Sequence, residues 1–367
     1  MSNTFYDRWA DVMVDYCTSV RADDKVAILG GVAAEPLLRA IHRAALRKGA
    51  EVHLLPSLSE SLADTLNNAS EAQLAHVSEL ERWRHEVATV TITVMASTNT
   101  RAQTSVDPAR QTIYSRARAE LKDISMRRAA AGDVRWSLTI FPTAAYAQDA
   151  DMATDEFAAF LAGAMYLDQP DPVAAWQELS ARQQTLIDWL SSRSELHITG
   201  PDTDLRMNVG SRKWINSDGK RNFPSGEVFT GPHEDSAEGH VRFAFPVVTD
   251  GREISDIRLR FERGMVVDAS ASKNERYLID TLDTDPGARR LGEIAFGTNF
   301  GITRFTRNIL LDEKIGGTMH MALGAGYPET GNSNKSGIHW DMICDLRAGG
   351  QATLDGEVIL QDGAYRV

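Results

Sequence analysis

Residues 25–56, KVAILGGVAAEPLLRAIHRAALRKGAEVHLLP, contain the pattern that decides the fold of the first half of the chain. An apolar run ending in two glycines is followed by a segment with helical spacing of its apolar residues, and then by a second short apolar run. Pro36 lies in the first turn of the expected helix and Gly49 stops it. A strand, a helix and a strand in this order predict a βαβ crossover with two parallel strands.

The same alternation continues to about residue 190. The apolar runs VTITVMAS and RWSLTIFPT predict two more strands, and the segments EAQLAHVSELERWRHEV and ARQTIYSRARAELKDIS predict helices. Two further helical segments, DEFAAFLAGAMYL and DPVAAWQELSARQQTLIDWLSSR, follow as a bridge to the second half. We therefore expect an α/β N-terminal domain with a mainly parallel sheet over residues 1–190, including these bridging helices.

Beyond residue 190 the pattern changes to short alternating runs separated by Gly, Asp, Asn and Pro. Examples are DLRMNV, HVRFAFPVV and ISDIRLRFERGMVVDASAS. This pattern is typical of antiparallel strands joined by tight turns. We expect a β-rich α+β C-terminal domain over residues 191–367. The glycines that follow the first strand of the chain lack the G-x-G-x-x-G spacing, which disfavours a dinucleotide site.

The composition of the chain disfavours several classes of protein. A formal net charge of −12 over 367 residues makes nucleic acid or an anionic membrane an unsuitable partner. The two cysteines, Cys17 and Cys344, lie far apart in the sequence, which argues against a disulfide framework and against a cysteine-based zinc site. The first residues, MSNTFYDRWADVMVDYC, do not resemble a secretory signal, and no apolar run approaches bilayer length, so we expect a cytoplasmic location.

The segment SGIHWDMICDL (residues 336–346) places His339 and Asp341 two residues apart within a stretch that otherwise has the pattern of a buried strand. In a strand these two side chains share one face, and Trp340 and Met342 share the other. Burying an unpaired carboxylate is costly unless a positive charge meets it. A metal ion would supply that charge.

Two more predicted strands combine a ligand-type side chain with very small neighbours. In LGEIAFGTN, Glu293 shares its face with an alanine and a glycine, and in GTMHMALGAGYPE the same is true of His320. Small neighbours leave room for an ion and a substrate, whereas a histidine in an ordinary core more often lies among bulky apolar residues. Glu227 in FPSGEVFTGP adds a third carboxylate, and Glu313 and Tyr327 are candidates for proton transfer.

The candidate metal ligands are therefore Glu227, Glu293, His320, His339 and Asp341. Ligation by oxygen and nitrogen without sulfur suits Zn²⁺, Co²⁺ or Mn²⁺. Three carboxylates and two imidazoles are more than one catalytic zinc usually takes, and they suit two divalent ions about 3.5–4 Å apart. The alternative interpretation is that these residues are unrelated surface groups or ion-pair partners.

At these residues the sequence resembles the thermophilic aminopeptidase T family of metallopeptidases. The resemblance runs over most of the chain and is strongest in three long blocks. These are DTDLRMNVGSRKWINSDGKRNFPSGEVFTGPHEDSAEG, LDTDPGARRLGEIAFGTNFGITRFTRNILLDEKIGG and HMALGAGYPETGNSNKSGIHWDMICDL. The metal ligands of the family fall on the five candidate residues, and the glutamate and tyrosine that line its site fall on Glu313 and Tyr327.

The resemblance implies a two-domain, homodimeric metallo-aminopeptidase, a hydrolase with two divalent metal ions per subunit. Such an enzyme removes N-terminal residues from short peptides with broad specificity. Under this hypothesis we expect Glu313 to act as the general base and then as the acid toward the leaving amine. Tyr327 would donate a hydrogen bond to the developing oxyanion.

A second hypothesis uses only His320, His339 and Asp341. Two histidines and one carboxylate form the facial triad of mononuclear iron(II) oxygenases, and some proteins similar to this family are dioxygenases that open hydroxypyridine rings. Under this hypothesis Glu227 and Glu293 need not both be ligands. Their joint presence therefore favours the peptidase.

Overall fold

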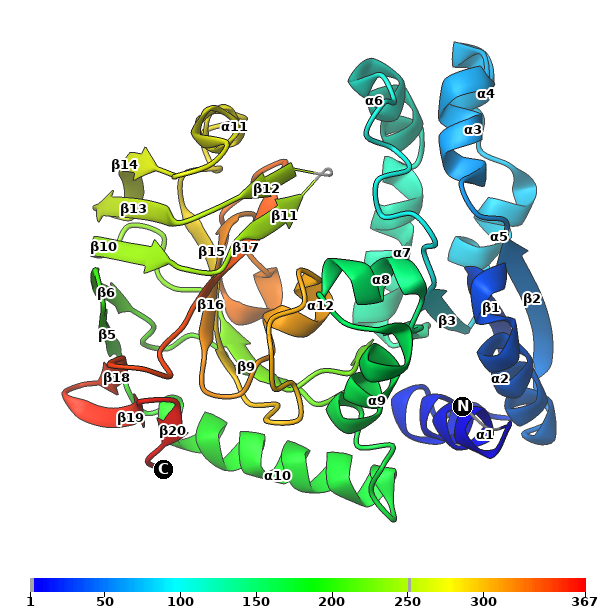
Figure 1. Cartoon of the computed structure of the whole chain (residues 1–367), viewed down its shortest axis with the longest axis horizontal. Helices are drawn as coiled ribbons and strands as arrows, with labels where there is room; N and C mark the ends of the chain where they lie inside the picture. The colour runs from blue at the N-terminus through cyan, green and yellow to red at the C-terminus, as the bar shows by residue number, and fades with distance from the viewer. Residues whose placement is uncertain (1–2, 250–251) are drawn as a thin grey trace. The chain divides into compact units, whose positions relative to one another are not determined.

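The computed structural model describes residues 3–249 and 252–367, and the chain forms two compact units that are described separately here (Figure 1). Unit 1 runs to Val173 and also contains Gly219–Pro224. Unit 2 contains Ala174–Asp218 and Ser225–Val367.

Helix α10 (Pro172–Leu190) belongs to unit 2 from Ala174 onward. The boundary near residue 190 that we inferred from the sequence differs from this division over the length of that helix. The physical reason is that Leu186, Ile187 and Leu190 of α10 are buried in the apolar core of unit 2.

Unit 1 is built on a five-stranded sheet in the order β2-β1-β3-β4-β8, and its neighbouring strands are parallel. The predicted parallel α/β region is thus confirmed, with α2 (Glu35–Arg47) connecting β1 to β2 and packing on both. The strands are β1 (Lys25–Gly31), β2 (Glu51–Ser57), β3 (Val90–Met95), β4 (Arg135–Ile140) and β8 (Asn222–Phe223).

The helices of unit 1 are shorter than the sequence pattern suggests. The segment 71–87 forms two helices rather than one, because Ser78 and Glu81 make a capping box that starts a new helix. Among the described residues, no helix is both long and apolar enough to cross a membrane. Besides α2, the helices are α1 (Asn3–Asp11, continued by the π-helical Val12–Cys17), α3 (Ser61–Asn68), α4 (Glu71–Ala75), α5 (Glu79–Glu86), α6 (Pro108–Ala117), α7 (Ala119–Ala131), α8 (Ala144–Asp149) and α9 (Thr154–Ala164).

Unit 2 is the β-rich region that the sequence predicts. It contains an eight-stranded antiparallel sheet in the order β14-β13-β10-β6-β5-β18-β19-β20, a five-stranded antiparallel sheet in the order β17-β16-β15-β9-β7, and the antiparallel pair β11-β12. Its elements are β5 (Glu195–Gly200), β6 (Thr203–Asn208), β7 (Ile215–Ser217), β9 (Glu227–Thr230), β10 (Glu238–Phe243), β11 (Val247–Thr249), β12 (Arg252–Ile254), β13 (Ile257–Glu262), β14 (Met265–Ser270), α11 (Glu275–Leu282), β15 (Leu291–Gly297), α12 (Ile309–Asp312), β16 (Met319–Gly324), β17 (His339–Cys344), β18 (Gln351–Leu354), β19 (Glu357–Gln361) and β20 (Ala364–Tyr365).

Both sheets of unit 2 contribute to one apolar core. Phe243 and Phe261 of the larger sheet belong to it, as do Phe296, Met321 and Met342 of the smaller sheet. Because successive side chains of a strand point to opposite faces, the second face of the five-stranded sheet does not have to be apolar. That second face carries the candidate site.

Candidate metal centre

The register of the five-stranded sheet brings the candidate ligands together. Glu293 on β15 pairs with Ala322 on β16, and Ala322 pairs in turn with Asp341 on β17. The two carboxylates therefore lie on either side of a methyl group. His320 precedes Ala322 by two residues and His339 precedes Asp341 by two, so both imidazoles lie on this same face.

Because Ala322 separates the two carboxylates and is fully buried, replacing it by valine is expected to push them apart. The added methyl groups should lower the free energy of unfolding by about 1–3 kcal/mol and weaken metal binding. Metal content after dialysis and urea denaturation would measure both effects. Met321→Leu is the matched control, because Met321 lies on the core face and the exchange conserves volume. Full metal content in Ala322→Val would contradict this role.

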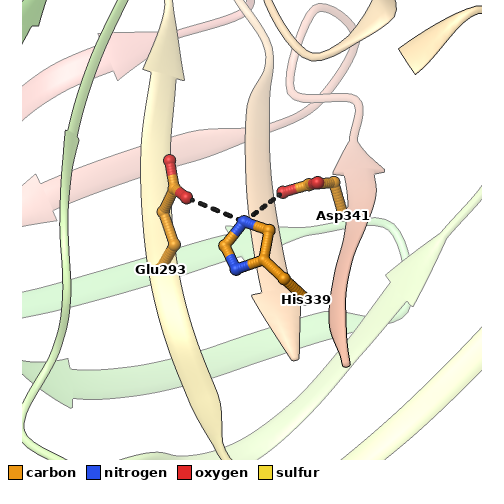
Figure 2. A group of neighbouring side chains, drawn as sticks. All are labelled: Glu293, His339 and Asp341. Carbon is orange, nitrogen blue, oxygen red and sulfur yellow. Dashed lines mark ion pairs between the residues drawn. The ribbon is translucent and has the colours of Figure 1, made fainter. Parts of the chain in front are cut away.

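The first group of ligand-type side chains consists of Glu293, His339 and Asp341 (Figure 2). His339 Nε2 lies 3.2 Å from Glu293 Oε2 and 3.5 Å from Asp341 Oδ1. The other ring nitrogen, Nδ1, donates a hydrogen bond to the carbonyl of Ala325 at 2.8 Å. A backbone carbonyl on Nδ1 orients the ring and leaves Nε2 as the ligand atom, as is usual for histidines that bind metals.

The second group consists of Glu313, His320 and Asp341. His320 Nδ1 donates to the backbone carbonyl of Glu313 at 3.0 Å, and His320 Nε2 lies 3.4 Å from Glu293 Oε1 and 3.7 Å from Asp341 Oδ1. Both imidazoles therefore use the same arrangement. Glu293 faces the two rings with different oxygens, whereas Asp341 faces both with one oxygen.

Glu227 lies at the edge of this cluster and belongs to neither group. It begins β9, pairs with Gly297 and is 5% exposed. Its Oε2 atom is 3.7 Å from His320 Nδ1, and its Oε1 atom is 3.7 Å from Lys314 Nζ. The same ammonium contacts the carboxylate of Glu313. Glu227 thus faces the cluster through one oxygen and a lysine through the other.

Lys314, which is 0% exposed, is a residue of this region that is absent from the candidates predicted from the sequence. The signal for it was present: it is a lysine in the segment ILLDEKIGG, between apolar residues that are themselves buried, such as Leu311 and Ile315. A lysine is almost never fully buried unless it is paired. Burial disfavours its charged form, but the charges of Glu227 and Glu313 outweigh this effect and raise its pKa.

Tyr327 is an exposed residue beside His339. Its ring centroid is 5.2 Å from that of His339 and 5.4 Å from that of Phe229, and the residue is 40% exposed. Burial of the phenol and the charges of the neighbouring carboxylates raise its pKa. The hydroxyl therefore keeps its proton at neutral pH and can act as a hydrogen-bond donor.

Several buried carboxylates lie close together in the cluster, and their combined negative charge favours the binding of a cation. Burial disfavours charging of both imidazoles, but the hydrogen bond to Glu293 and the surrounding carboxylates raise the pKa of His320 to about 10 and that of His339 to about 9. Burial raises the pKa of Glu227 to about 7 and that of Asp341 to about 6. Burial acts on Glu293 too, but the hydrogen bonds of the two imidazoles lower its pKa to about 2.

The residues of the cluster fit a metal ion. Within the described part of the chain, Glu227 Oε2 and Asp341 Oδ1 are buried oxygens that accept no hydrogen bond, which is an arrangement that a bound cation would relieve. The two Nε2 atoms and the carboxylates form a set of nitrogen and oxygen donors without sulfur, as expected for zinc, cobalt or manganese. Such ions require neutral imidazoles and ionised carboxylates.

Metal affinity should therefore rise with pH. Because the pKa values of His320 and His339 are about 10 and 9, both rings carry a proton at neutral pH that a metal ion must displace. Raising the pH removes these competing protons, so the apparent dissociation constant should fall by up to about tenfold per pH unit for each proton released. Titration against a chelator at pH 6, 7 and 8 measures this. An affinity independent of pH would show that metal binding releases no proton from the imidazoles.

The chain is similar in sequence to known metallopeptidases and aminopeptidases. The model of the family described as thermophilic metalloprotease (M29) matches residues 3–365. The chain is 29% identical to aminopeptidase 2 of Geobacillus stearothermophilus, with 97% of this chain and 94% of that protein covered. It is 36% identical to aminopeptidase T of Thermus thermophilus over 46% of this chain and 45% of that protein. Aminopeptidase PepS of Streptococcus thermophilus is 30% identical over 66% and 63%.

Two solved structures share the fold. Wild-type AmpT from Thermus thermophilus superimposes with a TM-score of 0.85 at 24% identity, covering 99% of each chain. A 2,5-dihydroxypyridine dioxygenase from Pseudomonas putida KT2440 gives a TM-score of 0.59 at 16% identity, covering 100% of this chain and 98% of that one. At these identities both likenesses concern the fold alone.

Proposed function

Because this chain belongs to the thermophilic metalloprotease family M29, we propose that it removes N-terminal residues from short peptides, with broad specificity and two metal ions. Family membership and the relatives named as aminopeptidases make it a metallo-aminopeptidase, a hydrolase. The observation that carries the finer proposal is the approach of two imidazole Nε2 atoms to the same two carboxylates, Glu293 and Asp341.

Two divalent ions would be held from two sides of the cluster. His320 would hold one ion through Nε2, His339 and Asp341 would hold the other, and Glu293 supports sharing because it presents a different oxygen to each ring. Glu227 is proposed as a further ligand because its buried Oε2 accepts no hydrogen bond and lies 3.7 Å from the His320 ring. Zinc, cobalt or manganese suits this donor set. When bound, such a pair acidifies a water molecule and polarises the scissile carbonyl.

Glu313 and Tyr327 would supply the proton chemistry. The Glu313 carboxylate lies with His320 and Asp341 in one group, where it could accept a proton from the attacking water and pass it to the leaving amine. Tyr327 keeps its phenolic proton and lies against the ring of His339. From there it would donate to the oxyanion of the tetrahedral intermediate.

Hydrolysis of a leucyl chromogenic amide by protein loaded with cobalt or zinc tests this function. We expect activity that a chelator removes and either ion restores. The N-acetylated amide is the control, because an enzyme that needs a free α-amine leaves it intact. No hydrolysis by loaded protein, or equal hydrolysis of both compounds, would contradict the proposal. A homodimer is also proposed, and light scattering of the purified protein tests it.

A mononuclear iron dioxygenase is the second candidate. Asp341 Oδ1 lies 3.7 Å from His320 Nε2 and 3.5 Å from His339 Nε2, which would satisfy a facial triad. Glu293 faces both imidazoles and Glu227 faces that of His320, and these two additional carboxylates favour the peptidase. Oxygen consumption by iron-loaded protein with 2,5-dihydroxypyridine separates the two candidates, and we expect none.

A further inference from the structure

Lys314 contacts two carboxylates of the candidate centre from inside the protein. Its ammonium pairs with the Glu313 carboxylate and lies 3.7 Å from Glu227 Oε1. The side chain is fully buried, so water does not screen these interactions as it would at a surface. The two carboxylates come from β9 and from the residue that follows α12, and one ammonium contacts both.

The backbone fixes the position of this lysine. Lys314 N donates to the carbonyl of Leu311, and Asn299 N donates to the carbonyl of Lys314, both at 3.1 Å. Gly297, the partner of Glu227 in the sheet, permits this approach, because a Cβ atom there would lie 2.1 Å from the carbonyl oxygen of Ile315. The segment that carries Lys314 therefore packs closely against the end of β15.

The charge balance of the proposed centre includes one permanent cation, Lys314. Four carboxylates face it, from Glu227, Glu293, Glu313 and Asp341, and two divalent ions would balance their four negative charges. Lys314 then adds one positive charge, which would balance the single negative charge of a hydroxide nucleophile. A buried site that must hold such an anion is stabilised by a fixed positive charge that no proton exchange has to supply.

We infer that Lys314 is a positioning residue of this centre. Its ammonium holds the Glu313 and Glu227 carboxylates in place and repels the metal ions electrostatically. This inference rests on the proposed function. It predicts that removing the ammonium lowers kcat but raises the affinity for metal. Removing the ammonium releases a carboxylate that must be oriented for proton transfer, which lowers kcat. It also removes a positive charge beside the ions, which tightens metal binding.

The test is Lys314→Met, which keeps the length of the side chain and removes its charge. We expect kcat at saturating metal to fall by about tenfold or more, with KM changed less than about threefold. Zinc affinity, measured by chelator competition, should increase by about tenfold. Lys273→Met is the matched control, because Lys273 also pairs with a glutamate, Glu253, but is 57% exposed and remote in sequence from the ligands. Both quantities should stay unchanged in the control.

The outcomes separate this inference from a purely structural role. A lysine that only supports the fold would weaken metal binding and kcat together when it is removed, and that result overturns the inference, as does an unchanged kcat. If Lys314→Met does not fold, Glu227→Gln with Lys314→Met removes the charges of Lys314 and of its more deeply buried partner, so that only the less buried Glu313 carboxylate loses its ion pair. We expect this double variant to fold, and its failure to fold overturns the inference. Wild-type protein without peptidase activity would instead contradict the proposed function, while the zinc affinities would still test Lys314.

Discussion

Asp341→Asn is expected to abolish peptide hydrolysis, with kcat/KM lowered by more than about a thousandfold out of the roughly millionfold or greater acceleration typical of enzymes. Asp341 belongs to both groups of ligand-type side chains in the described structure, and its Oδ1 atom lies within 3.7 Å of both imidazoles. The amide keeps the shape of the side chain but loses the negative charge that attracts a divalent ion. Metal analysis after dialysis, together with rates on a leucyl amide, measures both losses.

Asp345→Asn is the control for this variant. Asp345 follows the same strand, and its carboxylate accepts hydrogen bonds from Arg347 outside the cluster. This change should leave metal content and kcat near those of the wild type. An Asp341→Asn protein with the metal content and turnover of the wild type would show that the side chain is not a ligand.

Glu313→Gln is expected to lower kcat by about 10²–10⁴-fold, the usual contribution of a general acid or base. Metal content should remain at the wild-type level, because the proposed ligands on β9, β15, β16 and β17 are unchanged. The amide cannot accept the proton of the attacking water, although it can still accept a hydrogen bond from Lys314. Steady-state rates and metal analysis of the same preparation provide the two readouts.

This variant separates the two roles, because ligand-type atoms of Glu313, His320 and Asp341 lie within 4.8 Å of one another and could hold one ion. Loss of an ion in Glu313→Gln would identify the carboxylate as a metal ligand and contradict its role as a base. Glu262→Gln is a suitable control, since Glu262 is an exposed glutamate that pairs with Arg260 on β13.

Much of the fold was predictable because the pattern of each strand is local. Alternation alone placed His339 and Asp341 on one face and Trp340 and Met342 on the other, and the structure has this arrangement in β17. The parallel sheet of unit 1 followed from strands that alternate with helices. These predictions need only the period of the side chains and the length of the connections.

The rest depends on contacts between distant segments, which a single sequence does not specify. The pairing of Glu293, Ala322 and Asp341 in one row is a matter of strand register. The position of Lys314 beside Glu227 depends on how the α12 segment packs against Gly297. Register and packing are tertiary properties, so the ligand types could be named from the sequence while their grouping could not.

The two faces of the five-stranded sheet have different functions: one packs in the core and the other carries the candidate site. This separation affects how the protein can evolve. The apolar face maintains the fold, with Phe296, Met321 and Met342 in the core, while the opposite face carries the reactive groups. Exchanges of reactive side chains that conserve volume leave the apolar packing of the other face in place, so natural selection can alter the chemistry without first rebuilding that core. An architecture of this kind is well suited to give rise to enzymes of different reaction classes within one lineage.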